Sequence, residues 1–251
     1  MKYFVVGDIH GCIRQLNKLL NEWSPEKGRL VFLGDYVDRG EDSLAVIQTV
    51  QQYVHEHGAI ALGGNHEQLF LDWLEDPVEA DVFVMNGGVQ TIDSFLQNRG
   101  LSWSNKEVTE AIQEEFSSEI AFLRSLPNYF EDEHHVFVHA GVDFRLDDWR
   151  AGSDNSFRWI REEFYHRPNT SGKTIVFGHT PTCNIHPGRL NCDIWRSPCD
   201  SKIGIDGGAV FGGFLHGIVI ENGQLQQVYS ISSSLECIYR QVESSSTNIS
   251  E

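Results

Sequence analysis

The sequence has few basic residues. It carries 19 Lys and Arg against 36 Asp and Glu over 251 residues, a formal net charge of −17. The backbone of a long nucleic acid would meet a repulsive average field at such a surface, so long nucleic acid is excluded as an expected partner. Much of the acidic excess serves solubility, and part of it can be local, made of carboxylates that bind cations.

Cysteine and long apolar runs are scarce as well. The five cysteines include no CxxC pair, which argues against a disulfide framework and against a zinc knuckle. The most apolar window, residues 203–220, contains Asp206, His216 and six glycines, so it does not predict a membrane span. The apolar stretch at the N-terminus is too short for a signal peptide. We therefore expect a cytoplasmic protein with no membrane partner.

Short apolar runs alternate with amphipathic stretches in the first third of the chain. Their periodicity predicts three strands and two intervening helices, at 3–6, 12–23, 30–33, 43–55 and 59–62. This order is typical of an α/β domain with a largely parallel sheet. Later apolar runs predict a second sheet with several antiparallel strands, at 136–138, 174–177, 203–205, 215–220 and 226–231.

The chain shows no internal repeat and no convincing linker. We therefore expect a single domain over residues 1–243, with a mostly helical insertion around 68–126. The Ser-rich segment 244–251 is expected to be a disordered tail.

Glycine stands beside a ligand-type residue at or near several predicted strand ends. These segments are GDIHG (7–11), GDYVDRG (34–40), GNHE (64–67), HAG (139–141), GHT (178–180) and IDGGA (205–209). Taken alone, a Gly-Asp pair is typical of a turn, and a His after an apolar strand is typical of a structural residue. Asp8 and Asp35 are 27 residues apart, and Asp35 and Asn65 are 30 apart, each about one strand–helix crossover. Their side chains therefore return to the same edge of one sheet, where α/β proteins collect ligands.

The donor atoms in these segments belong to carboxylates, an amide and imidazoles. Carboxylate and imidazole favour Mn, Fe, Zn or similar ions, and the absence of cysteine argues against a purely thiophilic metal. Two cations about 3.5–4 Å apart need a bridging anion, which one carboxylate can supply. Such a pair lowers the pKa of a bound water and holds the oxygens of a phosphoryl group. The donor set therefore suits a two-metal site.

Taken in order, GDIHG, GDYVDRG, GNHE, HAG and GHT resemble the motifs of the calcineurin-like metallophosphoesterases. The resemblance is closest to the branch that contains the bacterial and phage serine/threonine protein phosphatases, and it spans residues 7–180. It implies an α/β fold in which two mixed β-sheets pack as a central sandwich flanked by helices, with a dimetal site at the strand ends.

The resemblance also implies roles for individual residues. Two divalent cations, expected to be Mn with Fe, Zn or Co as alternatives, would share six ligands: Asp8 and His10 on the first metal, Asp35 as the bridge, and Asn65, His139 and His179 on the second. His66 would be the general acid that protonates the leaving oxygen. Asp38 would orient His66 and raise its pKa, and Arg39 would hold phosphate oxygens.

A second phosphate-binding arginine follows a tryptophan in related bacterial enzymes. The segment Trp159-Ile160-Arg161 fits this W-x-R pattern, and we favour Arg161 over the adjacent Arg158. Either arginine could instead pair with an acid on a helix surface. The family often has Thr or Ser after the aspartate of the last motif, whereas Gly207 follows Asp206 here. We therefore expect Asp206 to be structural or to lie behind the metal ligands.

The activity that the resemblance implies is hydrolysis of phosphate monoesters, of the phosphoserine or phosphothreonine type, by attack of metal-bound hydroxide. The substrate would be a phosphorylated protein or a small phosphate ester. One alternative is a dinucleoside polyphosphate hydrolase of the diadenosine tetraphosphate type on the same fold. A non-catalytic phosphoprotein-binding protein is disfavoured, because Asp38, Arg39 and His66 are all present. The net charge disfavours a nuclease that acts on polymeric nucleic acid. It does not disfavour a phosphodiesterase that acts on a small cyclic nucleotide.

Overall fold

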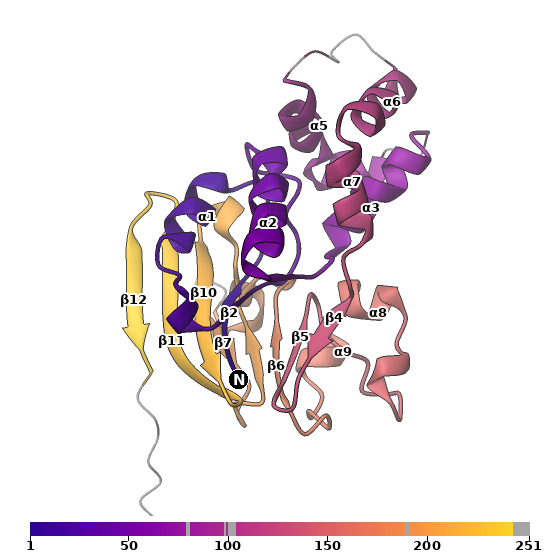
Figure 1. The fold of residues 1–251 in the computed structure, drawn as a ribbon. Coiled ribbons are helices and arrows are strands. Elements are labelled where there is room, and N and C mark those ends of the chain that lie inside the picture. The colour runs from indigo at the N-terminus through magenta and orange to yellow at the C-terminus, as the bar shows by residue number, and fades with distance from the viewer. Residues whose placement is uncertain (79–80, 98, 100–103, 189–190, 243–251) are drawn as a thin grey trace, which may run out of the picture.

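The computed structural model describes residues 1–78, 81–97, 99, 104–188 and 191–242. Two mixed β-sheets pack against each other in this part of the chain, and helices cover their outer surfaces (Figure 1). The predicted fold class is confirmed. The predicted tail, residues 244–251, lies outside the described residues.

The first sheet contains the N-terminal strand at its centre. Its order is β12-β11-β10-β1-β2-β3, with β9 paired to β10. The strands are β1 (Lys2–Val6), β2 (Arg29–Phe32), β3 (Ile60–Ala61), β9 (Asp206–Gly207), β10 (Phe214–Glu221), β11 (Gln224–Ser232) and β12 (Cys237–Gln241). Strands β1, β2 and β3 are parallel, as the crossover pattern predicts, whereas β10 runs antiparallel to β1.

Two later strands lie in a different sheet from the predicted one, so this prediction is wrong. Segments 215–220 and 226–231, predicted to lie in the second sheet, form β10 and β11 of the first sheet. In the observed register Val6 lies opposite Gly217 and Lys2 opposite Glu221. Apolar periodicity identifies a strand but contains no information about its partner, which is decided by the packing of the whole sheet.

The second sheet has the order β4-β5-β6-β8-β7. Its strands are β4 (Tyr129–Glu131), β5 (His135–Val138), β6 (Thr174–Phe177), β7 (Trp195–Arg196) and β8 (Lys202–Gly204). Strands β5, β6 and β8 run parallel, while β4 and β7 are antiparallel edge strands. Each sheet thus contributes parallel strands whose carboxyl ends carry the sequence motifs.

The central strands are buried on both faces, because successive side chains of a strand point to opposite sides. Tyr3 and Val5 belong to the core between the sheets, and the Tyr3 ring meets Phe137 of the second sheet at 4.9 Å between centroids. Phe4 and Val6 point the other way and pack in the core that includes Leu16 of α1.

Helices cover both outer faces (Figure 1). The first sheet is covered by α1 (Ile13–Leu20) and α2 (Ser43–His57), and the second by α8 (Asp154–Trp159) and α9 (Glu162–Tyr165). Asp42 caps α2 by accepting a hydrogen bond from the Ala45 amide at 3.0 Å, and Gly58 ends the helix in the left-handed conformation. No helix in the described residues has the length and apolar character needed to cross a membrane.

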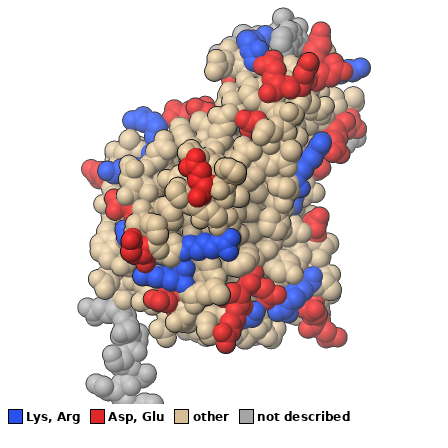
Figure 2. All heavy atoms as spheres, in the orientation of Figure 1, with Lys and Arg blue, Asp and Glu red and all other residues tan. Residues whose placement is uncertain are grey.

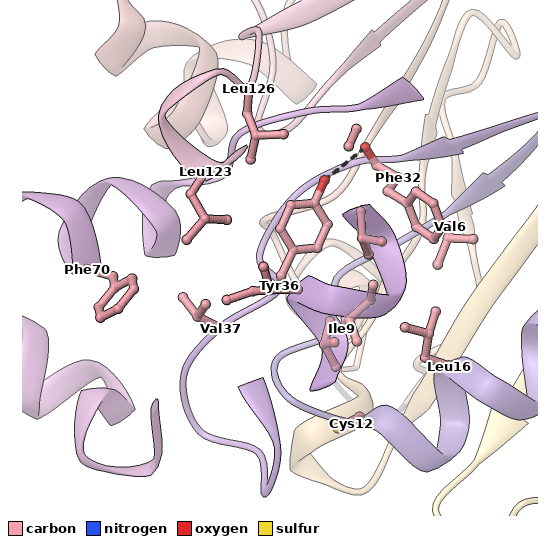
Figure 3. Packing of buried hydrophobic residues seen from close by; sticks show 14 of the residues in the cluster. Val6, Ile9, Cys12, Leu16, Phe32, Tyr36, Val37, Phe70, Leu123 and Leu126 are labelled. Carbon is pink, nitrogen blue, oxygen red and sulfur yellow. Dashed lines mark hydrogen bonds between the residues drawn. The ribbon is translucent and has the colours of Figure 1, made fainter. Parts of the chain in front are cut away.

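A group of helices between β3 and β4 extends beyond the sheets (Figure 1). We call it the helical region; it comprises α3 (Asn65–Glu75), α4 (Asp81–Phe83), the π-helical turn Val84–Gly88, α5 (Val89–Leu96), α6 (Asn105–Glu115) and α7 (Ser117–Arg124). Figure 3 shows Phe70 and Leu123 of this region beside Val37 and Tyr36 of the GDYVDRG loop. The helical region therefore shares one apolar core with the loop that follows β2.

Acidic side chains gather at the outer end of the helical region, as Figure 2 shows. Helix α6 alone exposes Glu107, Glu110, Glu114 and Glu115. Part of the net negative charge therefore lies far from the strand ends, on a solvated helix surface.

One ion-pair network ties the edge strand β4 to its neighbours. Both carboxylate oxygens of Glu131 accept from Arg150, at 2.6 and 2.8 Å, and Lys173 donates to the same group at 2.7 Å. The bonds from Arg150, followed by those from Lys173, lower the pKa of Glu131 from 4.5 to about 2. A carboxyl group whose pKa is lower in the folded state stabilises the fold above its unfolded pKa and loses that effect on acidification.

We expect Glu131→Gln to lower the free energy of unfolding by about 1 kcal/mol at pH 7, since solvent screens this half-buried network. The difference from the wild type should shrink as the pH falls from 4.5 toward 2, where Glu131 of the folded protein becomes protonated. Urea unfolding at several pH values measures it. Glu133→Gln is the control, because the Glu133 side chain is 88% exposed. A difference that stays constant down to pH 3 would contradict this assignment.

Candidate active site

The carboxyl ends of the parallel strands of both sheets meet at one cleft. Asp8 follows β1, Asp35 follows β2, and Asn65 begins α3 just after β3. From the second sheet, His139 follows β5 and His179 follows β6. The convergence arises because each crossover returns the chain to the same edge of its sheet.

Several site residues have strained backbone conformations. Five of the non-glycine residues with positive φ belong to the predicted site: His10 (46°), Asp35 (53°), Asp38 (70°), Arg39 (69°) and His179 (62°). Residues other than glycine rarely adopt this left-handed backbone conformation, and such strain concentrates at functional sites. Gly34 precedes Asp35 with φ 107°, and a Cβ there would lie 2.7 Å from the Gly64 amide nitrogen, so only glycine fits.

Asp35 lies between two groups of donor atoms. Its Oδ2 is 3.4 Å from His10 Nε2, and its Oδ1 is 3.3 Å from His139 Nε2. On the second side, Asn65 Oδ1 lies 2.9 Å from His139 Nε2 and 2.8 Å from His179 Nδ1. Ligand atoms of Asp35, His139 and His179 all lie within 4.8 Å of one another. The structure thus brings together residues that the resemblance assigns to two cations, and it places Asp35 between the two groups.

Asp8 provides a test of whether these residues fit a metal. One of its oxygens, Oδ2, accepts from the His179 amide at 2.9 Å, whereas Oδ1 is buried and has no hydrogen-bond partner among the described residues. Burial, and then the charges of Asp206 and Asp35, raise the pKa of Asp8 well above its ordinary value. A buried carboxylate oxygen without a donor beside two further carboxylates is costly unless a cation balances it. The site therefore fits divalent cations.

The imidazoles are in the protonation state that ligation needs. Burial lowers the pKa of His139 to about 3, and it lowers the pKa of His10 and of His179 well below the ordinary value. Neutral rings keep a nitrogen lone pair that can bind a metal. Two of these rings also have an orienting contact: His10 Nδ1 lies 2.8 Å from the Val37 carbonyl, and His139 Nδ1 lies 3.0 Å from the Leu33 carbonyl.

His66 and Asp38 form a buried pair next to these groups. The Nδ1 of His66 lies 2.6 Å from Asp38 Oδ2, and its Nε2 lies 4.0 Å from Asp35 Oδ2. The geometry leaves Nε2 free to meet a substrate in the cleft. The net pKa of His66 is lowered, because burial outweighs the opposing charge of Asp35. The expectation that Asp38 raises this pKa stays a prediction. Burial likewise raises the pKa of Asp38 to about 7, although a hydrogen bond from Thr91 acts in the opposite direction.

Two arginines line the cleft. The guanidinium of Arg39 contacts His10 and lies 5.3 Å from the centre of the Phe211 ring. Arg161 donates to the His179 carbonyl at 3.0 Å and to Thr180 Oγ1 at 3.2 Å. Arg158 instead donates to Asn128 at 2.9 Å, away from the cleft. Of the two candidate arginines, the structure places Arg161 at the site.

These groups surround a cavity of about 500 Å³. Its lining includes His10, Asp35, Arg39, His66, Arg161 and His179, together with the exposed ring of Phe211. Asp206 also lines the cavity; its Oδ1 accepts from the Gly208 amide at 2.9 Å, and burial raises its pKa to about 6. The arrangement can hold cations, bind the oxygens of a phosphoryl group and present a proton donor to a leaving group.

Sequence reasoning missed Glu67 and Thr91. Glu67 accepts from the backbone amides of Asp35, Tyr36 and Gly64 at 2.7–2.8 Å, and so holds the strained loop against the start of α3. A signal existed, since a Glu three residues after a helix N-cap is typical of a capping box. Thr91 has no comparable local signal, because its contacts are with residues about 50 positions away.

Comparison with known proteins identifies the family. The profile of the calcineurin-like phosphoesterases matches residues 1–195, and the chain belongs to this family. It is 32% identical over 227 residues to serine/threonine-protein phosphatase 1 of Salmonella typhimurium, covering 84% of this chain and 88% of that one. It is 29% identical over 252 residues to the bis(5'-nucleosyl)-tetraphosphatase PrpE of Bacillus cereus, with coverage of 87% and 90%.

Solved structures show the same fold. The cold-active protein-tyrosine phosphatase of a psychrophilic Shewanella species superposes with a TM-score of 0.55 at 18% identity, covering 96% of this chain and 80% of that one. A serine/threonine phosphatase of Saccharomyces cerevisiae gives a TM-score of 0.54 at 15% identity, with coverage of 97% and 80%.

Replacing Asp8 tests the metal site. Asp8→Asn removes one buried negative charge, so the metal-free variant should have a higher melting temperature than the metal-free wild type. Saturating Mn²⁺ should stabilise the wild type by about 2.7 kcal/mol at 100 times the Kd, and the variant by much less. Thermal unfolding with EDTA and with Mn²⁺ measures both effects. Asp147→Asn, at an exposed position, is the control; equal Mn²⁺ shifts in the Asp8 variant and the wild type would argue against the ligand role.

The two neighbouring arginines allow a matched comparison. Arg161→Ala should reduce kcat/KM on p-nitrophenyl phosphate roughly 10–100-fold, because it removes a charged donor from the phosphate position. Arg158→Ala should leave kcat/KM within about threefold of the wild type, since its guanidinium lies outside the cavity. Steady-state kinetics of both variants at equal metal loading provides the test. A larger loss in the Arg158 variant would reverse the assignment.

Proposed function

We propose that this phosphoesterase hydrolyses phosphate monoesters of the phosphoserine or phosphothreonine type with two divalent cations, of which Mn²⁺ is the expected metal. The observation that carries the proposal is the buried His66–Asp38 pair beside Asp35. An alkoxide leaves only with a proton donor, whereas the phosphate released from an anhydride is a weaker base and needs less help. The similarity to serine/threonine-protein phosphatase 1 supports the same substrate class.

Asp8, His10, Asp35, Asn65, His139 and His179 would hold the metals. When bound, the two cations supply Lewis acidity that lowers the pKa of a water and neutralises phosphate charge. Arg39 and Arg161 orient the equatorial oxygens of the phosphoryl group from two sides of the cavity.

His66 then acts on the leaving group. Its Nδ1–H is directed to Asp38, so Nε2 faces the cavity. In the imidazolium form Nε2 also carries a proton, and this proton passes to the departing oxygen. The Asp38 carboxylate stabilises the imidazolium before the transfer and keeps the ring oriented during it.

The free state of all five cysteines supports a further proposal, that the protein works in the cytoplasm.

One observation favours a second candidate function, the hydrolysis of dinucleoside polyphosphates. Phe211 lies at the cavity with 68% of its surface exposed, close to Arg39. An exposed aromatic ring beside a phosphate-binding arginine can stack on a nucleobase. The similarity to the PrpE tetraphosphatase points in the same direction.

A substrate panel with wild type and His66→Asn separates the two functions. On a phosphoserine peptide, Mn²⁺-loaded wild type should be active, chelation should abolish the activity, and His66→Asn should reduce kcat roughly 10²–10⁴-fold. On p-nitrophenyl phosphate, whose leaving group needs little protonation, the variant should lose less than about tenfold.

Diadenosine tetraphosphate is the third substrate of the panel. A lower kcat/KM on this anhydride than on the peptide supports the monoester proposal. A higher value, with little effect of His66→Asn, would establish the second function in its place. Equal losses on the peptide and on p-nitrophenyl phosphate would remove the acid role of His66.

A further inference from the structure

The carboxylate that orients His66 is itself held by a side chain from the helical region. Asp38 is fully buried, and its Oδ1, the oxygen that does not face His66, accepts a hydrogen bond from Thr91 Oγ1 at 2.7 Å. The same Thr91 hydroxyl accepts from the Asp38 backbone amide at 2.9 Å. Thr91 lies on α5 and is also fully buried. One hydroxyl therefore contacts both the backbone and the side chain of Asp38.

Ser43 completes this hydrogen-bond group. Its Oγ accepts from the Asp38 amide at 3.1 Å and lies 3.2 Å from Thr91 Oγ1. Because the only proton of the Thr91 hydroxyl goes to Asp38, the Ser43 hydroxyl is the one that can donate between the two. With Ser43 as the donor in that contact, the Thr91 hydroxyl keeps its proton for the Asp38 carboxylate.

The helical region contacts the rest of the protein on both sides of Thr91. The Gly87 carbonyl accepts from the Arg39 amide at 3.1 Å, and a Cβ on Gly87 would lie 2.6 Å from that nitrogen. On the other side of Thr91, Ser94 Oγ accepts from the Leu44 amide at 3.1 Å. Asp38 itself has φ 70°, a conformation that requires support from its surroundings.

We propose that Thr91 is a positioning residue for the proton donor of this enzyme. Its hydroxyl fixes the Asp38 carboxylate in the rotamer that directs Oδ2 at His66 Nδ1, so the helical region forms part of the acid machinery. The inference rests on the proposed acid role of His66. It predicts a loss that depends on the leaving group, which a change confined to folding or phosphate binding would not produce.

The test uses Thr91→Val, which removes the hydroxyl at nearly constant volume, and Thr91→Ser, which keeps it. In the Mn²⁺-loaded enzyme, Thr91→Val should reduce kcat on a phosphoserine peptide about 10–100-fold, as expected for a lost hydrogen bond to a buried carboxylate. The loss on p-nitrophenyl phosphate should be less than about threefold and KM should not change, because His66 is only weakly required there. Thr91→Ser should restore most of the kcat on the peptide.

Thr109→Val is the matched control. Thr109 is buried in the same helical region, but its hydroxyl donates to the Lys106 carbonyl, so this variant should keep both activities. If Thr91→Val does not fold, Thr91→Ala removes the same hydroxyl without adding atoms and is held to the same criteria. Equal losses on both substrates, no loss on the peptide, or no recovery in Thr91→Ser would overturn the proposal.

A second readout does not depend on activity. The proton in the 2.6 Å contact between His66 and Asp38 should give a strongly downfield ¹H NMR signal in the Zn²⁺-loaded protein, and His66→Asn assigns it by removing it. The signal should move upfield or broaden in Thr91→Val and persist in Thr91→Ser. An unchanged signal in Thr91→Val would contradict the positioning role.

The two proposals fail in different ways. A wild type inactive on both esters, or equal losses in His66→Asn on both, defeats the proposed function. A leaving-group-dependent loss in His66→Asn that Thr91→Val does not reproduce defeats only the role of Thr91.

Discussion

Electrostatic repulsion among Asp8, Asp35 and Asp206, all nearly excluded from water, is the constraint on which the rest of the structure depends. Burial raises the pKa of each of these carboxyl groups, and one oxygen of Asp8 has no donor in the described part of the chain. Cations bound among these carboxylates would balance their charge and offset the cost of burying them. The two sheets meet at their carboxyl ends and so bring carboxylates of the first sheet beside the neutral imidazoles of the second. The site thus depends on the sandwich as a whole rather than on any one motif.

Several residues of the same cleft have strained backbone conformations, and contacts from neighbouring segments must stabilise them. Asp35 and Asp38 both have positive φ, and each is supported from the helical region. Glu67 accepts from the amides around Asp35, while Thr91 accepts from the amide of Asp38 and donates to its carboxylate. The loop after β2 is therefore shaped by contacts from α3 and α5 as much as by its own glycines. The same helical region also shares an apolar core with Tyr36 and Val37 of this loop (Figure 3).

We propose that the substrate class is decided at the mouth of the cavity, where Arg39, Arg161 and His66 meet the exposed surface. His66, oriented by Asp38, suits a leaving group that needs a proton, and Phe211 offers a flat apolar surface to whatever is attached to the phosphate. Relatives named as a protein phosphatase and as a dinucleoside tetraphosphatase both align along most of this chain. The family thus includes relatives named for more than one substrate, and in our proposal residues outside the motifs, such as Phe211, distinguish those substrates.

The sequence by itself determined the central strands of both sheets, the parallel order of the first three and the family, because periodicity and short Gly-Asp or Gly-His motifs are local properties. It did not predict the short or peripheral strands β4, β7, β9 and β12. It also predicted which residues converge, since crossover length returns Asp8, Asp35 and Asn65 to one sheet edge. Only the tertiary structure decided that β10 joins β1 and that Thr91 contacts Asp38. It also placed Arg161, which the W-x-R pattern favoured over Arg158, at the cavity. These features depend on contacts between residues distant in sequence. Such contacts stabilise the protein only when the whole core is packed. Burial also lowers the pKa of His66, which no motif indicates, because the exclusion of water is a property of the folded cleft.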